Sequence, residues 1–225
     1  MLLTPRLKKI ADLIPLGSTI ADIGTDHAYL PSYCILNDIC KSAIAMDINK
    51  GPLNSAGQTV SNYGIEDKVE LRLSDGIEAL KKGETDVIVI AGMGGLLIKN
   101  ILSKDMHLIK EGTLLILQPM LAQKELREFL YETGNSVVDE YLAKESDKIY
   151  NIIVAKAGQK TSWEKSDILI GKNIKENSPD LYKHYIEKQI RILTKIINGQ
   201  KMAVNTDAKI LEASAFELQM LQKEI

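Results

Sequence analysis

Short apolar runs alternate with amphipathic stretches along roughly the first 155 residues of the chain. The apolar runs predict strands over Thr19–Ile23, Lys41–Asp47, Val69–Leu73, Asp86–Ala91 and Gly112–Gln118. Between them, apolar residues at helical spacing predict helices over Pro5–Ile14, Ala28–Asn37, Pro52–Tyr63, Ile77–Lys81 and Leu121–Glu132, with another running from the glycines at 92–95 to about Leu102. Strands that alternate with helices predict an α/β fold with a doubly wound, mostly parallel sheet.

Two further strands are predicted over Val137–Leu142 and Ile149–Ala155, with no helix between them. They read as a hairpin that adds an antiparallel edge to the sheet. The run Val87-Ile-Val-Ile90 is continuously β-branched, which is typical of a central strand that is covered on both faces.

The pattern changes near Gly158, beyond which it is helical only. Apolar residues recur at spacings of three and four, at Leu181, Tyr185, Ile186, Ile190, Leu193 and Ile197, and then at spacings of seven, at Leu211, Leu218 and Ile225. Asn198-Gly199 separates the two series. Narrow apolar stripes on two long helices predict an antiparallel α-helical hairpin of coiled-coil type. We therefore expect two domains, residues 1–158 and residues 159–225.

Charge adds a partner hypothesis for the second domain. The 225 residues carry a net charge of −2, which is not typical of a strongly basic nucleic-acid binder, but residues 160–209 hold ten Lys and Arg against six Asp and Glu. The candidate contacts to a polyanion are Lys172, Lys175, Lys183, Lys188, Arg191 and Lys195. The alternative is a solvated helix face with no partner.

The remaining composition excludes several classes of protein. Cys34 and Cys40 have no metal-type spacing, so we expect buried, reduced thiols and no metal site. No apolar run approaches the ~20 residues that span a bilayer, and the first residues lack the apolar core of a signal peptide. These features predict a cytoplasmic protein with no membrane association.

Polar residues and glycines follow four of the predicted parallel strands. Gly24 and Asp26 follow the first strand, Asp47 the second, Asp75 the third and Gly92 the fourth. The carboxyl ends of parallel strands line one edge of such a sheet, so these residues should converge on one crevice. Asp47 lies 23 residues after Gly24, a spacing that suits a carboxylate on ribose hydroxyls. Asp75 is then placed to contact an adenine amino group.

The turn at Gly24 differs from a dinucleotide fingerprint. Gly24-Thr25-Asp26-His27 lacks the second and third glycines of GxGxxG and puts a carboxylate where a diphosphate would bind. An acidic loop favours a cofactor with a positive centre and a free amine. S-adenosylmethionine fits this description, whereas a nicotinamide dinucleotide fits poorly.

Several motifs together resemble one protein family. They are Ile20-Ala-Asp-Ile-Gly-Thr-Asp-His-Ala-Tyr-Leu30, Ala45-Met-Asp-Ile48, Ser74-Asp-Gly76, Ala91-Gly-Met-Gly-Gly95 and Gln118-Pro119. In combination they resemble the bacterial tRNA adenine-N1 methyltransferases that modify position 22, over essentially the whole chain. The resemblance implies a class I, Rossmann-like methyltransferase fold, S-adenosyl-L-methionine as cofactor and tRNA as substrate.

The chemistry of the target atom agrees with this resemblance. Adenine N1 has an in-plane lone pair that attacks a sulfonium methyl directly, while the exocyclic amine is a poorer nucleophile. Enzymes that methylate the amine usually carry Asn/Asp-Pro-Pro-aromatic after the fourth strand, and this chain has Ala91-Gly-Met-Gly-Gly95 there. Proximity should supply most of the catalysis, and the candidate catalytic residues are Asp26, His27 and Tyr29. The candidate cofactor-binding residues are Asp22, Gly24, Thr25, Asp47, Ile48, Asp75, Gly76, Gly92, Met93 and Gly94.

Alternatives remain open at this point. Asp22 either holds the amine of the cofactor or is tied into the backbone of the loop, and Asp26 is either catalytic or orders the loop by accepting from helix amides. The substrate is alternatively a small molecule or a protein, or the chain is a non-catalytic RNA-binding module. We expect a monomer and leave a homo-oligomer open.

Overall fold

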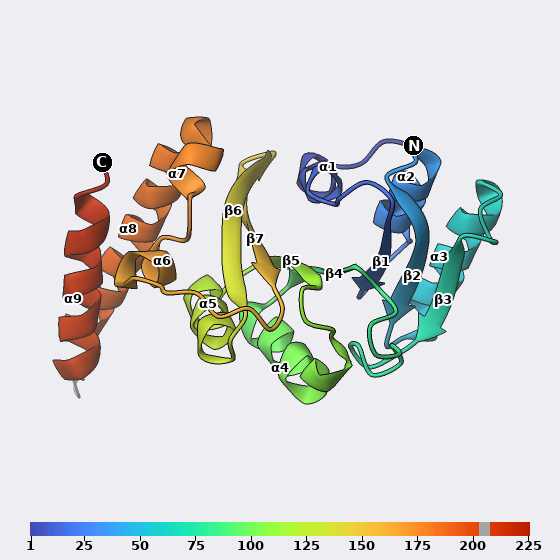
Figure 1. The fold of residues 1–225 in the computed structure, drawn as a ribbon. Coiled ribbons are helices and arrows are strands. Elements are labelled where there is room, and N and C mark those ends of the chain that lie inside the picture. The colour runs from blue at the N-terminus through green and yellow to red at the C-terminus, as the bar shows by residue number, and fades with distance from the viewer. Residues whose placement is uncertain (203–207) are drawn as a thin grey trace.

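The computed structural model describes residues 1–202 and 208–225. This part of the chain forms a seven-stranded sheet with the strand order β3-β2-β1-β4-β5-β7-β6 (Figure 1). The strands are β1 (Ser18–Ile23), β2 (Cys40–Asp47), β3 (Val69–Leu73), β4 (Val87–Met93), β5 (Leu114–Pro119), β6 (Ser136–Glu145) and β7 (Lys148–Lys156). Neighbours among β1 to β5 are parallel, and β7 is antiparallel to both β5 and β6. The predicted parallel sheet with an antiparallel edge hairpin is confirmed.

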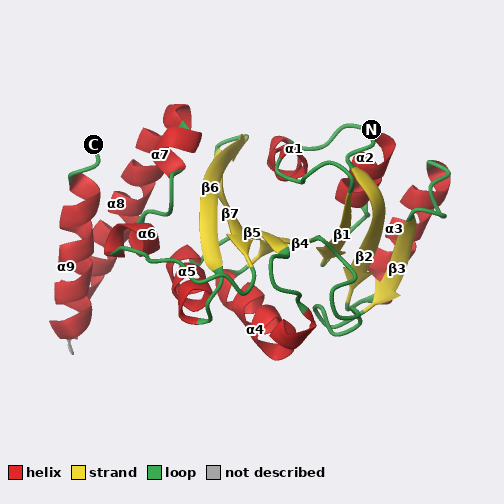
Figure 2. Ribbon diagram, in the orientation of Figure 1, coloured by secondary structure: helices red, strands yellow, loops and turns green. Residues whose placement is uncertain are grey.

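Helices cover both faces of the sheet (Figure 2). The described helices are α1 (Pro5–Asp12), α2 (Tyr29–Leu36), α3 (Lys50–Asn62), α4 (Gly95–Asp105), α5 (Gln123–Glu132), α6 (Lys165–Leu169), α7 (Ile174–Asn177), α8 (Pro179–Met202) and α9 (Ala208–Gln222), with a 3-10 turn over Met106–Leu108. One apolar cluster joins the sheet to α1, α2 and α3, and a second joins it to α4 and α5. This arrangement is a Rossmann-like, doubly wound fold.

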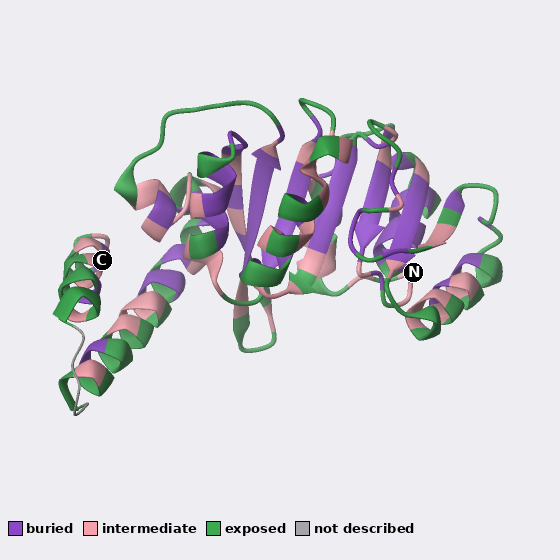
Figure 3. Cartoon of the chain, turned by 90° about the horizontal axis from the view of Figure 1, so that it is seen from below, coloured by how far each residue is buried: buried purple, intermediate pink, exposed green. Residues whose placement is uncertain are grey.

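The alternation of side chains along each strand decides which face each residue serves. Ile20 packs in the cluster with α1 to α3, whereas the next residue, Ala21, packs in the cluster with α4 and α5. Buried residues accordingly fill the strands, while the outer helix faces are exposed (Figure 3). Because successive strand residues point to opposite faces, Asp22 lies on the same face as Ile20, beneath α1. Cys34 and Cys40 are buried and free, as predicted.

The predicted helix over residues 77–81 is wrong. The segment forms turns, because side chains occupy the backbone groups that a helix would pair. Arg72 Nη1 donates to the Ala79 carbonyl at 2.9 Å, and Ser74 Oγ accepts from the Ala79 amide at 3.2 Å. Side-chain bonds of this kind compete directly with helix formation.

The predicted break at Asn198-Gly199 is also wrong, because α8 continues through it to Met202. A helical glycine costs about 1 kcal/mol relative to alanine, which is too little to end a helix of 24 residues. The burial of Ile197 just before Gly199 adds tertiary packing that offsets this cost.

The last helices lie beyond the β6 edge of the sheet (Figure 1). Tyr182 Oη, near the start of α8, donates to a carboxylate oxygen of Glu224, just after α9, at 2.7 Å. The two helices therefore run antiparallel, and Tyr182, Tyr185, Ile186 and Leu221 form a separate small core. No helix in the described residues combines the length and the apolar content that crossing a membrane requires.

Candidate functional site

The carboxyl ends of β1 and β4 border a pocket of about 410 Å³. Its walls come from the first turn of α1, the end of β1, the loop before α2 and the end of β4. The lining residues are Arg6, Leu7, Asp22, Gly24, Thr25, Asp26, His27, Tyr29, Leu30, Ala91 and Gly92. Seven residues that the sequence predicts for the site therefore meet around one cavity, and Arg6 is a charged residue that the sequence did not predict.

Gly24 turns the chain out of β1 in a backbone conformation with φ +74°, which disfavours residues with a side chain. The amides of Gly24 and Thr25 both donate to the carbonyl of Met46, at 2.8 and 2.9 Å, and this ties the loop to the end of β2. A Cβ at position 24 would lie 2.1 Å from Met93 Cε. The turn therefore favours glycine at position 24, and a side chain there would also have to displace the flexible end of Met93.

Asp22 is a buried carboxylate at the inner end of the pocket. Its residue is 8% exposed, and burial raises the pKa of Asp22 to about 6, against the lowering influence of Thr25 and of the positive charge of Arg6. A desolvated carboxylate favours a cationic partner, because a positive charge offsets the cost of its burial. The arrangement suits the binding of an ammonium group.

Thr25 provides a second buried polar group beside Asp22. The residue is 3% exposed, and its hydroxyl makes no well-formed hydrogen bond within the described residues, although it lies near enough to the Asp22 carboxylate to lower the pKa of that group. A buried hydroxyl without a partner costs free energy, so such a group is expected to meet a ligand. Asp22 and Thr25 together mark the floor of the pocket as a polar binding surface.

Arg6 lines the pocket and is bonded to Gln118, which is not among the lining residues. Arg6 Nη1 donates to Gln118 Oε1 at 2.8 Å, and the amide of Gly92 donates to the same oxygen at 3.1 Å. Gln118 is fully buried at the end of β5. A polar side chain at the end of an apolar strand is a sequence signal that could have indicated a role for Gln118 at this site. No spacing in the sequence connects Arg6 to the carboxyl ends of the strands.

The three candidate catalytic residues lie at the mouth of the pocket. The rings of His27 and Tyr29 are stacked, with centroids 5.0 Å apart and an interplanar angle of 15°. His27 Nε2 lies 3.5 Å from Asp26 Oδ2, and the side chain of Asp26 is 82% exposed. Asp26 therefore points toward solvent, where an incoming substrate would meet it.

Asp47 and Asp75 lie at the same edge of the sheet but outside the pocket. The amide of Ser74 donates to the Asp47 carbonyl at 2.9 Å, so the ends of β2 and β3 are adjacent. Asp47 Oδ1 accepts from the amide of Asn49 at 2.7 Å, and the neighbouring Ile48 is 59% exposed. Asp75 Oδ2 lies 3.0 Å from Lys104 Nζ, which partly neutralises it.

The other predicted cofactor residues have backbone roles in the structure. Gly76 has φ +68°, and a Cβ there would lie 2.8 Å from Ile101 Cγ2. Gly92 has φ +78°, and a Cβ there would lie 3.7 Å from Arg6 Nη1. Gly94 precedes α4 as its N-cap, and Met93 reaches over Gly24. Gly92, Met93 and Gly94 thus shape the end of β4, whereas Gly76 shapes the turn that follows β3.

The predicted nucleic-acid residues lie on or before α8. Lys183, Lys188, Arg191 and Lys195 are exposed on α8, and the last three are spaced to share one face of it. Lys175 is already engaged, because its Nζ lies 3.6 Å from a Glu224 carboxylate oxygen. Lys172 lies just before α7, where its amide donates to Glu140 Oε1 at 3.2 Å.

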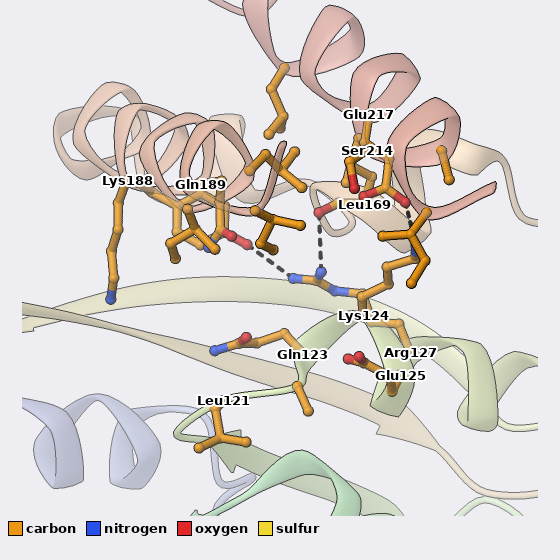
Figure 4. Close-up of a pocket in the computed structure, with 18 of the residues that line it drawn as sticks. Leu121, Gln123, Lys124, Glu125, Arg127, Leu169, Lys188, Gln189, Ser214 and Glu217 are labelled. Atoms are coloured by element: carbon orange, nitrogen blue, oxygen red, sulfur yellow. Dashed lines mark hydrogen bonds and ion pairs between the residues drawn. The ribbon is translucent and has the colours of Figure 1, made fainter. Parts of the chain in front are cut away.

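A groove of about 540 Å³ separates α8 and α9 from the loop after β5. Figure 4 shows Lys188 and Gln189 of α8 on one side of it, with Leu121 of the loop and Gln123 at the start of α5 on the other. The amide of Gly95 donates to the Leu121 carbonyl at 2.8 Å. The groove therefore begins beside the glycines that follow β4.

No group of three or more His, Cys, Asp or Glu residues able to hold a metal ion occurs in the described part of the chain.

Comparison with known proteins identifies similar chains. Residues 3–153 match the protein family described as a methyltransferase domain. A tRNA (adenine(22)-N(1))-methyltransferase of Bacillus subtilis is 43% identical over 158 residues, which are 70% of this chain, and the match spans 66% of that relative's length.

Solved structures agree with this similarity over nearly the whole chain. The crystal structure of the B. subtilis m1A22 tRNA methyltransferase TrmK has a TM-score of 0.85 and 34% identity, and the match covers 99% of this chain and 98% of that one. M. capricolum TrmK in complex with S-adenosyl-homocysteine has a TM-score of 0.83 and 32% identity, with 100% and 98% covered.

Proposed function

The chain belongs to the methyltransferase-domain family, among the bacterial tRNA (adenine(22)-N(1))-methyltransferases, and we propose that it transfers a methyl group from S-adenosylmethionine to N1 of adenine 22 in tRNA. The observation that carries this proposal is the buried polar floor of the pocket, formed by the Asp22 carboxylate with its raised pKa and the neighbouring Thr25 hydroxyl. Both suit the amino-acid end of the cofactor. The M. capricolum relative holds the product form of the same cofactor.

The residues at the sheet edge fit this cofactor from end to end. Asp22 and Thr25 would hold its ammonium group, Asp47 its ribose hydroxyls and Asp75 its adenine amine. Gly24, Gly92 and Gly94 would leave room beside the strands, and Ile48, Gly76 and Met93 would line the nucleoside. S-adenosylmethionine supplies an electrophilic methyl group on a sulfonium centre.

The substrate side of the reaction depends on positioning. Adenine N1 is buried in a Watson–Crick pair, so the target base must be unpaired or flipped toward the pocket. The exposed ring of Tyr29, already stacked on His27, provides a surface for the base. N1 then attacks the methyl group in line and becomes cationic. Asp26 balances that charge or takes the proton of the exocyclic amine, with His27 as the second candidate.

Asp26→Asn is expected to lower kcat about 100-fold, at the low end of general acid–base contributions, because the carboxylate is largely exposed. Affinity for S-adenosylhomocysteine should stay within about 2-fold, since Asp26 faces the substrate. Single-turnover methylation and calorimetry measure the two effects. Wild-type turnover in the variant would exclude Asp26 from the chemistry, and an equal loss of cofactor affinity would move it to the cofactor site.

We infer a division of labour between residues 1–158, which would bind the cofactor, and residues 159–225, a helical hairpin of coiled-coil type that would contact tRNA. Lys188, Arg191 and Lys195 share one exposed face, and Lys188 also lines the groove that starts beside the site. Lys172, Lys175 and Lys183 are further candidates. A cytoplasmic location fits these roles, because tRNA would be the macromolecular partner, and we propose that the chain acts as a monomer.

Replacing Lys188, Arg191 and Lys195 together with alanine is expected to weaken tRNA binding and to reduce the slope of log affinity against log salt by about 2, because each phosphate contact contributes about 0.7 to 0.9. Fluorescence anisotropy at several salt concentrations measures this. The matched control replaces Lys68, Lys81 and Lys82, three exposed lysines near the amino ends of β3 and β4. If the slope of log affinity against log salt were equal in both triple variants, the basic face of α8 would not contact tRNA.

Nucleoside analysis tests the function itself. An unmodified tRNA transcript treated with the protein and labelled S-adenosylmethionine should yield 1-methyladenosine after digestion. A tRNA with guanosine at position 22 should yield none. Methylation of a small molecule or a protein instead would support the first alternative. Failure to bind S-adenosylhomocysteine below the millimolar range would support a non-catalytic RNA-binding module.

A further inference from the structure

The loop between β5 and α5 presents two neighbouring apolar side chains beside the candidate site. Met120 is 45% exposed and Leu121 is 61% exposed, and both line the groove that begins next to the glycines after β4. Gly94 lies close to this loop, because a Cβ there would meet Leu121 Cδ1 at 3.7 Å. Exposed apolar side chains that adjoin a binding site are typical of a surface that a partner covers.

The backbone of this loop is fixed against the end of β4. The amide of Met120 donates to the Met93 carbonyl at 2.8 Å, and the amide of Gly95 donates to the Leu121 carbonyl at 2.8 Å. A Cβ at position 95 would lie 2.3 Å from the Ala122 carbonyl oxygen, so the two segments are in direct backbone contact. Ala122 has φ +58°, in the left-handed region that residues with a side chain rarely adopt. Such a conformation persists only where the surrounding contacts impose it, so the loop holds Met120 and Leu121 at the surface.

The charges across the groove indicate what covers these two side chains. Lys188, which begins the basic face of α8, lines the groove opposite Leu121 (Figure 4). Of the two carboxylates in the groove, Glu217 pairs with Lys124 and Glu125 is exposed to solvent. A nucleic acid offers the complementary surface, because its bases have apolar faces and its phosphates are anionic. A purely apolar ligand would use none of the positive charge on α8.

We propose that Met120 and Leu121 form a wedge that enters the base stack of tRNA beside adenine 22. Their side chains occupy the space that the adenine leaves as it turns toward the pocket, as apolar side chains do when they insert between bases and unstack them. Gly92 lines the pocket and Gly94 adjoins Leu121, so the segment after β4 connects the pocket to the wedge. This inference rests on the proposed function, because it concerns how the target base of that reaction becomes accessible.

A fluorescent base at the target position tests the wedge directly. 2-Aminopurine in place of adenine 22 fluoresces more strongly when it is unstacked, so the wild-type chain with S-adenosylhomocysteine should raise its signal on binding. The double variant Met120→Ala with Leu121→Ala should lose most of this rise. Its affinity for the transcript should stay within about 3-fold, because phosphate contacts supply most of the affinity. No rise with the wild-type chain, or an equal rise with the variant, would overturn the proposal.

Methylation of two transcripts separates a wedge from a general defect. The first is the unmodified tRNA transcript, and the second is the same transcript with an abasic site opposite adenine 22. The kcat of the double variant should fall about 10- to 100-fold on the first. It should stay within about 3-fold of the wild-type value on the second, where the adenine leaves the stack more readily.

The control is Leu16→Ala, which removes an 82% exposed leucine before β1, at the opposite edge of the sheet, and should match the wild-type chain on both transcripts. An equal loss on both transcripts in the double variant would mean that Met120 and Leu121 only shape the site. No loss on either transcript would assign the apolar surface to another partner. Both results overturn the wedge, while 1-methyladenosine formation by the wild-type chain, and with it the proposed function, still stands.

Discussion

Glu140→Ala is expected to lower the free energy of unfolding by about 3–5 kcal/mol, the typical cost of leaving a buried charge without its partner. Glu140 is fully buried in β6, and its carboxylate faces the guanidinium of Arg127 on α5, which is 1% exposed. Arg127 Nε and Nη2 lie 2.9 and 2.8 Å from the two Glu140 oxygens. Without Glu140, a buried positive charge keeps only neutral partners.

The same pair fastens the C-terminal helices to the sheet. Arg127 donates to the carbonyls of Ile168 and Ile170, at 3.0 and 3.1 Å, and to Tyr185 Oη at 3.2 Å. The carbonyls belong to α6 and the residue after it, and Tyr185 belongs to α8. The loss of Glu140 should therefore also loosen the groove and weaken tRNA binding, while leaving affinity for S-adenosylhomocysteine within about 2-fold.

Urea denaturation measures the stability change. Glu132→Ala, which removes an exposed carboxylate from the last residue of α5, is the matched control. It should change the free energy of unfolding by less than about 0.5 kcal/mol. The double variant Arg127→Met with Glu140→Leu should recover about half of the loss or more, because no buried charge remains. A Glu140→Ala chain as stable as the control would contradict this account of the pair.

Asp22→Asn is expected to weaken binding of S-adenosylhomocysteine about 10- to 100-fold, because the neutral amide lacks the negative charge that attracts the ammonium. As Asp22 becomes protonated below about pH 6, the wild-type affinity should fall, by at most about tenfold per pH unit, toward the affinity of the variant. The affinity of Asp22→Asn for S-adenosylhomocysteine should not show this fall, because the amide at position 22 does not titrate.

The same substitution should change how stability depends on pH. The pKa of Asp22 rises from 3.8 to about 6 on folding, so between these values the folded chain binds more protons than the unfolded chain. The stabilising contribution of Asp22 to the free energy of unfolding is therefore fully present below pH 3.8, and it is lost as the pH rises through 6. Relative to Asp22→Asn, the wild-type chain should lose up to about 3 kcal/mol of stability between pH 4 and pH 8.

Unfolding in urea across this pH range, together with calorimetry at each pH, measures both effects. Asp67→Asn, which changes an exposed carboxylate before β3, is the control and should leave both profiles unchanged. Parallel stability profiles for the wild-type and Asp22→Asn chains would show that the carboxylate is not held at a raised pKa. Undiminished cofactor affinity in the variant would assign the ammonium to another group.

The sequence predicted most of the sheet because its strands carry a local signal. Buried parallel strands must be apolar on both faces, and Val87-Ile-Val-Ile90 and Ala43-Ile-Ala-Met46 meet that condition without reference to any other part of the chain. The segment 77–81 failed this local reading because Arg72 and Ser74, outside it, bind its backbone groups. The break at Gly199 failed because burial of the neighbouring Ile197 outweighs a small intrinsic cost.

The candidate site shows the same limit. Asp22, Gly24, Asp26 and Gly92 follow from the rule that parallel strands end at one edge, so the sequence determined that they lie together. Arg6 and Gln118 are 112 positions apart, and Arg127 and Ile170 are 43 apart. Local periodicity contains no information about pairs at such separations. The sequence by itself therefore determined where the strands lie along the chain and where the acidic glycine turn lies. Only the tertiary structure decided which charged side chains face each other, because those contacts depend on how whole helices pack on the sheet.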